Sequence, residues 1–395
     1  MPPSGAAGAA AERRALPLTA WERATGMAIG GGGLAAGPRP AGGASPRAAL
    51  DSVLARALAR PPCVVSFSGG RDSSVVLAAA VATARREGLA PPVAVTLRFA
   101  GVATAEESGW QELVVSHLGL GDWERIVIGD ELDLIGPVAR SGLHAHGLLW
   151  PPNTHLHVPI LERARGGGML TGWDGDGLFG SWRWARAQAV IHRRTDPRPR
   201  DLLRVGLALA PPAVRRPWMR PAVLGATPWV RAERRPELAA LLGADAAREP
   251  RRWDERIDHY RGRRYLALGI RSLELLARER DVEVCHPLLH PAFLTALGRD
   301  GGAAGYGGRT TAMGRLFGDL LPAALIERPG KAEFGRALWS GESRAYARAW
   351  AGGGVDPARV DPERLAREWT LPSPRFGAAT LLQLAWLAAQ GPQPK

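Results

Sequence analysis

Residues 63–80 read CVVSFSGGRDSSVVLAAA, and this stretch decides the fold. The apolar run 63–65 predicts a short buried strand, and the apolar, small-residue run 75–80 predicts a helix. Between them, the Ser-Gly-Gly turn at 68–70 leaves backbone N–H groups uncovered at a helix N-terminus, where the helix dipole favours an anion. The pattern therefore predicts a phosphate-binding turn.

An acid lies inside the same turn. Asp72 would repel phosphates unless a divalent cation lay between them, and Ser73 and Ser74 add hydroxyls to the first helical turn. No Gly-Lys-Ser/Thr follows, so the turn is not a Walker loop. The S-G-G-x-D-S string instead resembles the PP-loop of the ATP pyrophosphatases, which split ATP into AMP and pyrophosphate.

A second glycine turn occurs at residues 169–182, which read MLTGWDGDGLFGSW. Asp/Gly dipeptides usually mark surface turns, but here the following Leu-Phe pair at 178–179 anchors the turn in a core. The segment is similar to the G-E-G-A-D-E-L-F-G-G segment of asparagine synthetases. The resemblance implies that Asp176 joins Asp72 as a Mg²⁺ ligand, and two carboxylates with phosphate oxygens suit this hard cation.

A third match depends on an isolated lysine. The chain has 51 Lys and Arg residues, yet only Lys331 and the terminal Lys395 are lysines. Residues 328–335 read RPGKAEFG and look like the R-x-K-x-G-F stretch of asparagine synthetases. The resemblance makes Lys331 the candidate that stabilises charge in the adenylate-forming and amide-forming steps, whereas a surface lysine is the alternative. A compact ammonium suits a single oxygen better than the broad guanidinium of arginine.

The resemblance covers about residues 60–340. It implies a second strand at 93–99, whose backbone at Leu97 faces the adenine, and a third strand at 123–128. Residues 281–289 resemble the family's V-E-x-R-x-P-F-L-D, which makes Glu283 a candidate for orienting the substrate or relaying a proton. An ordinary carboxylate at the end of a helix is the alternative. The nucleotide-contacting residues implied by the resemblance are Ser68, Gly69, Gly70, Asp72, Ser73, Ser74, Leu97 and Gly172.

The chain also departs from asparagine synthetases. Residues 1–60 are rich in Ala, Gly and Pro and read as a partly disordered N-terminal extension, so we expect no glutaminase domain in this chain. Trp173 stands where the family has the acid that helps to deprotonate the amine, and Gly177 replaces the acid after Asp176. Asp174 could supply a base from the neighbouring position. Relatives with such changes include lasso-peptide macrocyclases and β-lactam synthetases, which close amide bonds within one substrate.

Composition limits the partners. The formal charge of +13 raises nucleic acid or membrane surfaces as partners, but the arginines are spread as pairs and the 14 tryptophans are scattered. No apolar run approaches the ~20 residues that span a bilayer, and no signal pattern is present. Cys63 and Cys285 lack metal spacing, which indicates a reducing compartment. We therefore expect a cytoplasmic protein that binds neither nucleic acid nor membrane.

These observations predict an α/β fold with a mostly parallel, twisted sheet, helices on both faces and a further helical C-terminal region, as in the adenine nucleotide alpha hydrolases. Residues 61–395 would form the ATP-binding domain, with an Arg/Pro-rich helical insertion at about 192–264. Helices are expected at 267–280 and 309–321.

The expected function is an asparagine synthetase-like amide synthetase that uses ATP and Mg²⁺. It would adenylate a small-molecule or peptide carboxylate and pass the acyl group to an amine or ammonia, supplied in one scenario by a separate protein. Three alternatives stay open: an intramolecular amide cyclase of natural-product biosynthesis, a PP-loop enzyme that adenylates a base or carrier, and a degenerate nucleotide-binding partner subunit.

Overall fold

A single parallel sheet forms the centre of the chain. The computed structural model describes residues 15–32, 43–180, 182–219, 223–328, 330 and 335–391. Its five strands lie in the order β3-β2-β1-β4-β5, and every neighbouring pair is parallel. Their bounds are Cys63–Ser66 for β1, Val93–Phe99 for β2, Trp123–Ile128 for β3, Gly168–Thr171 for β4 and Glu283–Cys285 for β5. The predicted α/β fold is confirmed.

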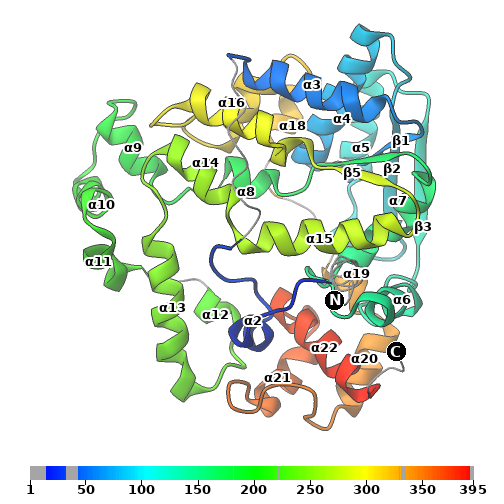
Figure 1. Cartoon of the computed structure of the whole chain (residues 1–395), viewed down its shortest axis with the longest axis vertical. Helices are drawn as coiled ribbons and strands as arrows, with labels where there is room; N and C mark the ends of the chain where they lie inside the picture. The colour runs from blue at the N-terminus through cyan, green and yellow to red at the C-terminus, as the bar shows by residue number, and fades with distance from the viewer. Residues whose placement is uncertain are drawn as a thin grey trace, which may run out of the picture.

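Alternation along β1 places its side chains in two separate cores. Val65 packs with α3 (Pro46–Leu58) and α4 (Arg71–Glu87), whereas Val64 packs with α7 (Val158–Arg163) and α15 (Arg264–Arg278). Successive strand residues point to opposite faces, so a short run of apolar residues can be buried on both sides. Helices therefore cover both faces of the sheet, as Figure 1 shows.

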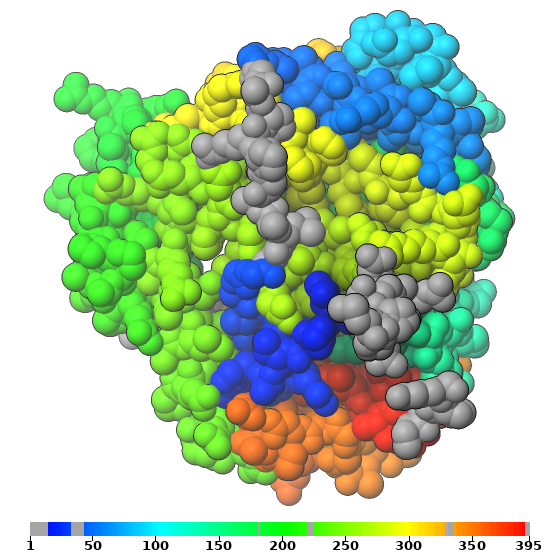
Figure 2. All heavy atoms as spheres, viewed as in Figure 1, coloured from blue at the N-terminus to red at the C-terminus, as the bar shows by residue number. Residues whose placement is uncertain are grey.

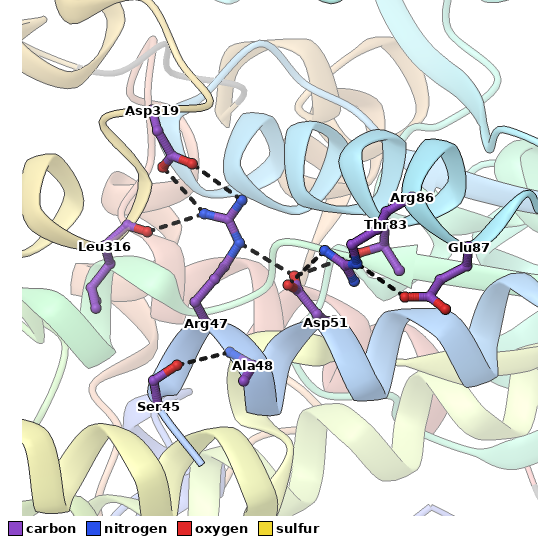
Figure 3. Close-up of polar contacts among 9 residues, drawn as sticks. All are labelled: Ser45, Arg47, Ala48, Asp51, Thr83, Arg86, Glu87, Leu316 and Asp319. Carbon is purple, nitrogen blue, oxygen red and sulfur yellow. Dashed lines mark hydrogen bonds and ion pairs between the residues drawn. The ribbon is translucent and has the colours of Figure 1, made fainter.

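The first long helix belongs to the body of the molecule. Leu50, Leu54 and Leu58 of α3 are buried beneath α4 and α16 (Pro291–Gly301). Arg47 and Arg86 both pair with Asp51 (3.3 and 2.9 Å), as Figure 3 shows. The expected extension over residues 1–60 must therefore be shortened, because the apolar stripe of α3 at helical spacing outweighs the Ala/Gly/Pro-rich composition around it.

Both helices expected from the sequence are present, with shifted ends. Helix α15 spans Arg264–Arg278 where the sequence predicts 267–280, and α17 spans Arg309–Phe317 where the sequence predicts 309–321. Around the sheet lie α5 (Ser108–Leu118), α6 (Pro137–His146), α8 (Gly175–Phe179), α18 (Ala323–Glu327) and α19 (Gly335–Leu338). Helix α9 (Ala185–Ile191) precedes the Arg/Pro-rich region, which contains α10 (Pro199–Leu209), α11 (Pro212–Arg215), α12 (Val223–Ala226), α13 (Arg235–Ala247) and α14 (Trp253–Arg261). Helices α9 to α11 lie at one side of the molecule (Figure 1).

A second helical layer joins the two ends of the chain. It comprises α2 (Ala20–Thr25), α20 (Gly341–Ala349), α21 (Pro362–Trp369) and α22 (Phe376–Ala389). The Trp229 indole donates to the Ala24 carbonyl (2.9 Å), and the Thr380 hydroxyl donates to Gly26 (3.1 Å). Figure 2 shows this N-terminal segment in blue, between α13 and the C-terminal helices. Within the described ranges, no helix combines the length and apolar composition that a bilayer crossing requires.

Candidate active site

The turn after β1 has the backbone expected of an anion site. Gly69 adopts φ +84°, and a Cβ there would lie 2.7 Å from the Gln111 side chain, so only glycine fits without strain. The Gln111 amide donates to the Ser68 carbonyl (3.1 Å) and holds the turn in place. Helix α4 begins at Arg71 without a side-chain cap, so the N–H groups of its first turn are oriented toward the cleft in front of it.

The serines of this turn differ in their positions. The hydroxyls of Ser68 and Ser73 lie 3.1 Å apart, and both residues line the cleft. Ser74 is fully buried, and its hydroxyl donates to the Gly70 carbonyl (2.8 Å). The structure therefore brings Ser68 and Ser73 to the site, whereas Ser74 supports the turn from within the protein.

The second glycine turn lies directly against the first. Strand β4 pairs with β1, with Thr171 opposite Ser66, so the turns that follow them leave the same edge of the sheet. A Cβ on Gly172 would lie 2.4 Å from the Ser73 nitrogen, and one on Gly175 would lie 2.3 Å from the Asp72 carboxyl carbon. These two glycines let the loops approach each other, which explains the glycines of the second motif.

The two candidate metal ligands, Asp72 and Asp176, meet at one guanidinium. Nη2 of Arg309 lies 2.7 Å from Oδ1 of Asp72, and its Nη1 contacts Oδ1 of Asp176. Within the described residues, no group of three or more His, Cys, Asp or Glu side chains could hold a metal ion. Two carboxylates of this kind suit a magnesium ion that takes its other ligands from phosphate and water.

A cleft of about 380 Å³ lies between the two turns. Its lining residues are Ser66, Ser68, Gly70, Arg71, Asp72, Ser73, His157, Thr171, Gly172, Trp173, Asp174, Asp176, Arg309, Arg328 and Gly330. A second, mostly apolar hollow of about 130 Å³ adjoins it and is lined by Ser66, Phe67, Ser68, Val95, Leu97, Phe99, Leu156, His157 and Ile160. Three residues line both hollows, so one ligand with a polar end and an apolar ring could span them. Leu97 lines the apolar hollow.

Asp174 is held by two tyrosines. The hydroxyls of Tyr260 and Tyr265 donate to its Oδ2 at 2.5 and 2.6 Å. Burial, followed by the negative charge of Asp174, raises the pKa of both phenols, so they remain protonated donors. Asp174 itself adopts φ 59°, and a Cβ on Gly177 would lie 2.7 Å from its carboxylate. The tyrosine hydroxyls therefore set the orientation of the Asp174 carboxylate, and Gly177 leaves the space that this orientation needs.

Trp173 packs into a space that a glycine leaves open. A Cβ on Gly269 of α15 would lie 2.0 Å from the indole of Trp173. The other neighbour is His286, whose ring centre lies 5.3 Å away. Nδ1 of His286 lies 2.6 Å from the Thr171 hydroxyl, and burial lowers its pKa to about 3, so the ring is neutral. The indole thus forms a wall of the cleft in place of the family's acid.

Glu283 is not brought to this cleft. It is the first residue of β5 and pairs in register with Gly168, at the amino end of the sheet. Its side chain is 70% exposed and forms an ion pair with Arg60 (3.2 Å). The strand instead delivers His286 to the carboxyl edge, where the ligand cleft lies.

Lys331 lies outside the described residues. The preceding described residues, Arg328 and Gly330, line the cleft. Arg328 forms a buried, two-pronged ion pair with Glu107 (2.5 and 2.6 Å) and donates to the Gly69 carbonyl (3.2 Å). Because Glu107 directly precedes α5 and Gly69 belongs to the first glycine turn, Arg328 fixes its part of the chain beside that turn.

Sequence reasoning missed several cleft residues. Arg309 belongs to no motif, and the two tyrosines lie about 90 positions from the aspartate that they contact. His157 stands in a His-x-His pair, which suggests a metal ligand or a loop histidine but not a wall of this cleft. The Gly-Gly pair before Arg309 was the one local signal, since a glycine pair beside a charged residue can mark a close approach to a ligand. Arg328 was visible as the first residue of the R-P-G-K string.

Comparison with known families gives one match. Residues 47–387 match the family model for asparagine synthase. The matched range includes both glycine turns and the segment around Lys331, which carried the resemblance, and it begins within α3. A comparison with curated proteins found no match.

Proposed function

The chain belongs to the asparagine synthase family, and we propose that it is an ATP-dependent, AMP-forming amide synthetase. In the proposed reaction, a substrate carboxylate attacks the α-phosphate of ATP, which forms an acyl-adenylate and releases pyrophosphate. An amine then attacks the acyl carbon and releases AMP. The observation that carries the proposal is the close approach of the two glycine turns, which places Asp72 and Asp176 in one cleft beside an apolar hollow.

The residues of the two hollows fit one ATP molecule, with its adenine and its phosphates in different hollows. The apolar hollow around Leu97 would take the adenine, and the N-terminus of α4 would take the phosphates. Asp72 and Asp176 would hold Mg²⁺, which when bound would neutralise charge on the phosphates. Lys331 would stabilise the charge that develops at the reacting centres.

Asp174 is the proposed base for the amine. The tyrosine hydroxyls at 2.5 and 2.6 Å orient its carboxylate, and general bases act efficiently when their orientation is set in advance. The proton of the attacking amine would pass to this carboxylate as the carbon–nitrogen bond forms. Trp173 would exclude water from that side of the cleft and protect the acyl-adenylate from hydrolysis.

A second candidate, an intramolecular amide cyclase, is favoured by a further cavity of about 320 Å³. It lies behind Asp174, because Gly177, Tyr260 and Tyr265 line it together with charged residues of α13 and α14. A substrate that carries both the carboxylate and the amine needs more room than aspartate and ammonia. The other version of the same chemistry is intermolecular: a small carboxylate would react with ammonia or with an amine that a separate protein supplies.

Pyrophosphate–ATP exchange with a panel of amino acids and peptides tests the proposal. We expect exchange that requires Mg²⁺ and a carboxylate, and AMP in equal amount to the amide product. A product that equals one substrate minus one water, formed without a second reactant, would identify the cyclase. If the protein binds the nucleotide but shows no exchange with any carboxylate of the panel, the degenerate partner subunit would be favoured instead.

A further inference from the structure

One positive charge already joins the two candidate metal ligands. The Arg309 guanidinium lies 2.7 Å from Asp72 and also contacts Asp176. The side chains of Arg309 and Asp72 are only 18% and 12% exposed, so solvent screens their attraction weakly. A residue of the chain itself thus offsets one of the two negative charges of the acidic pair.

The guanidinium and a divalent cation compete for the same two carboxylates. Mg²⁺ binds carboxylate oxygens directly at about 2.0–2.1 Å, so the donors of Arg309 must leave Oδ1 of Asp72 and of Asp176 before the ion can take them. The neighbouring Arg71 does not compete in this way. Its guanidinium is directed to the Ile326 carbonyl (3.2 Å) and the Thr310 hydroxyl (3.4 Å).

The structure provides a place for the displaced guanidinium. Arg309 also lines a separate cavity of about 200 Å³, whose walls include Trp182, Trp253 and Tyr306. Aromatic faces attract a guanidinium and accept it with little loss of solvation. Two glycines at φ +84° and +153° precede Arg309 at the start of α17, so the backbone before it can change direction cheaply. Nε of Arg309 is buried without a hydrogen-bond partner and loses no bond in the move.

We propose that Arg309 occupies the divalent-cation site of the nucleotide-free protein and yields it by turning toward the aromatic cavity when Mg²⁺ arrives with ATP. The inference rests on the proposed function, because it takes Asp72 and Asp176 as the metal ligands. Phosphate oxygens add ligands to the ion, so metal and nucleotide together displace the guanidinium more readily than the metal alone does. Metal binding and nucleotide binding are therefore coupled through Arg309.

Mn²⁺ titration of the full chain without nucleotide, followed by electron paramagnetic resonance, tests this inference. Arg309→Gln should bind Mn²⁺ about tenfold more tightly than wild type, the equivalent of about 1.4 kcal/mol. Arg309→Lys should fall between them, since one ammonium cannot bridge both carboxylates as a fork does. Arg71→Gln is the matched control. It removes the same charge from the same cleft, and it should change the Mn²⁺ affinity less than about threefold because it acts only at longer range.

Equal shifts for Arg309→Gln and Arg71→Gln would overturn the inference, since net charge would then explain both. Adding Asp176→Asn to Arg309→Gln should abolish the tighter binding, and its persistence would also contradict the inference. Pyrophosphate release by the wild-type protein is measured separately. Release without the Arg309-specific Mn²⁺ effect would refute the inference alone, whereas the Mn²⁺ effect without release for any carboxylate would refute the proposed function alone.

Discussion

In the proposed function, the cleft has a nucleotide half, which would bind ATP, and an acceptor half, which would bind the amine. The two halves are built in different ways. The nucleotide half comes from short runs at the carboxyl ends of adjacent parallel strands: the 68–73 turn, Leu97 and Asp176. The acceptor half is assembled by side-chain packing between distant segments, as when Tyr260 and Tyr265 hold Asp174. If the proposed function holds, backbone geometry sets the ATP chemistry, whereas packing sets the second substrate. Changes in one half should therefore affect one step of the reaction.

The largest expected effect concerns the nucleotide half. Asp72→Asn and Asp176→Asn each keep the shape of the side chain but remove a charged ligand, so pyrophosphate release should fall by on the order of 10³-fold, more than the 10–100-fold cost of outer-shell changes. The measurement is Mg²⁺-dependent pyrophosphate release, with circular dichroism to check the fold. Near-wild-type release by either variant would show that the paired-carboxylate assignment is wrong.

Lys331→Arg should have the next largest effect and should reach both halves. The variant keeps the charge but replaces a compact ammonium with a planar fork, which suits a single oxygen poorly. ATP binding should be unchanged, while product formation should fall by about 10²-fold, the usual cost of losing one preorganised oxyanion donor. If the variant forms product as fast as wild type, Lys331 has no catalytic role, since arginine is the chain's usual basic residue.

The same contrast explains what could be predicted from the sequence. The bounds of β2 and β3 and the positions of Ser68 and Asp176 could be predicted because each belongs to a run of consecutive residues that resembles a family segment. Glu283 shows the limit, because the short strand β5 has two ends and a motif does not say which end faces the ligand. Arg309 reaches the cleft, and the tyrosines reach Asp174, only through tertiary packing. The burial of α3 likewise depends on tertiary packing, because α4 and the sequence-distant α16 both pack against it.

Tyr265→Phe tests whether the two halves of the cleft serve separate steps of the reaction. It removes one of the two hydroxyls that orient Asp174, and a hydrogen bond to a charged group contributes about 1.5–3 kcal/mol. We expect amide formation to slow by roughly tenfold, while pyrophosphate–ATP exchange stays within about twofold of wild type. Tyr346→Phe is the control, because Tyr346 of α20 packs against the core of the second helical layer rather than on Asp174. An equal loss of exchange and amide formation would mean that Asp174 serves both steps.

The smallest expected effect is a pH dependence of stability at the wall of the acceptor half. Burial lowers the pKa of His286 to about 3, whereas an unfolded histidine titrates near ~6.5. Between these values the unfolded chain binds the proton and the folded chain does not. The free energy of unfolding therefore falls as the pH falls from about 6.5 toward 3, by at most about 1.4 kcal/mol per pH unit for this one residue.

His286→Asn should reduce that slope, because asparagine keeps an acceptor for the Thr171 hydroxyl but does not titrate. Urea unfolding at several pH values between about 5 and 7 measures the slope directly. The exposed His117 on α5 offers a control for the replacement of a histidine by asparagine. Burial also lowers the pKa of His155 and His157, so some slope should persist in the variant. If His286→Asn and wild type lose stability in parallel as the pH falls, then the ring of His286 takes up its proton in the folded protein, and the wall beside Trp173 is open to water rather than dry.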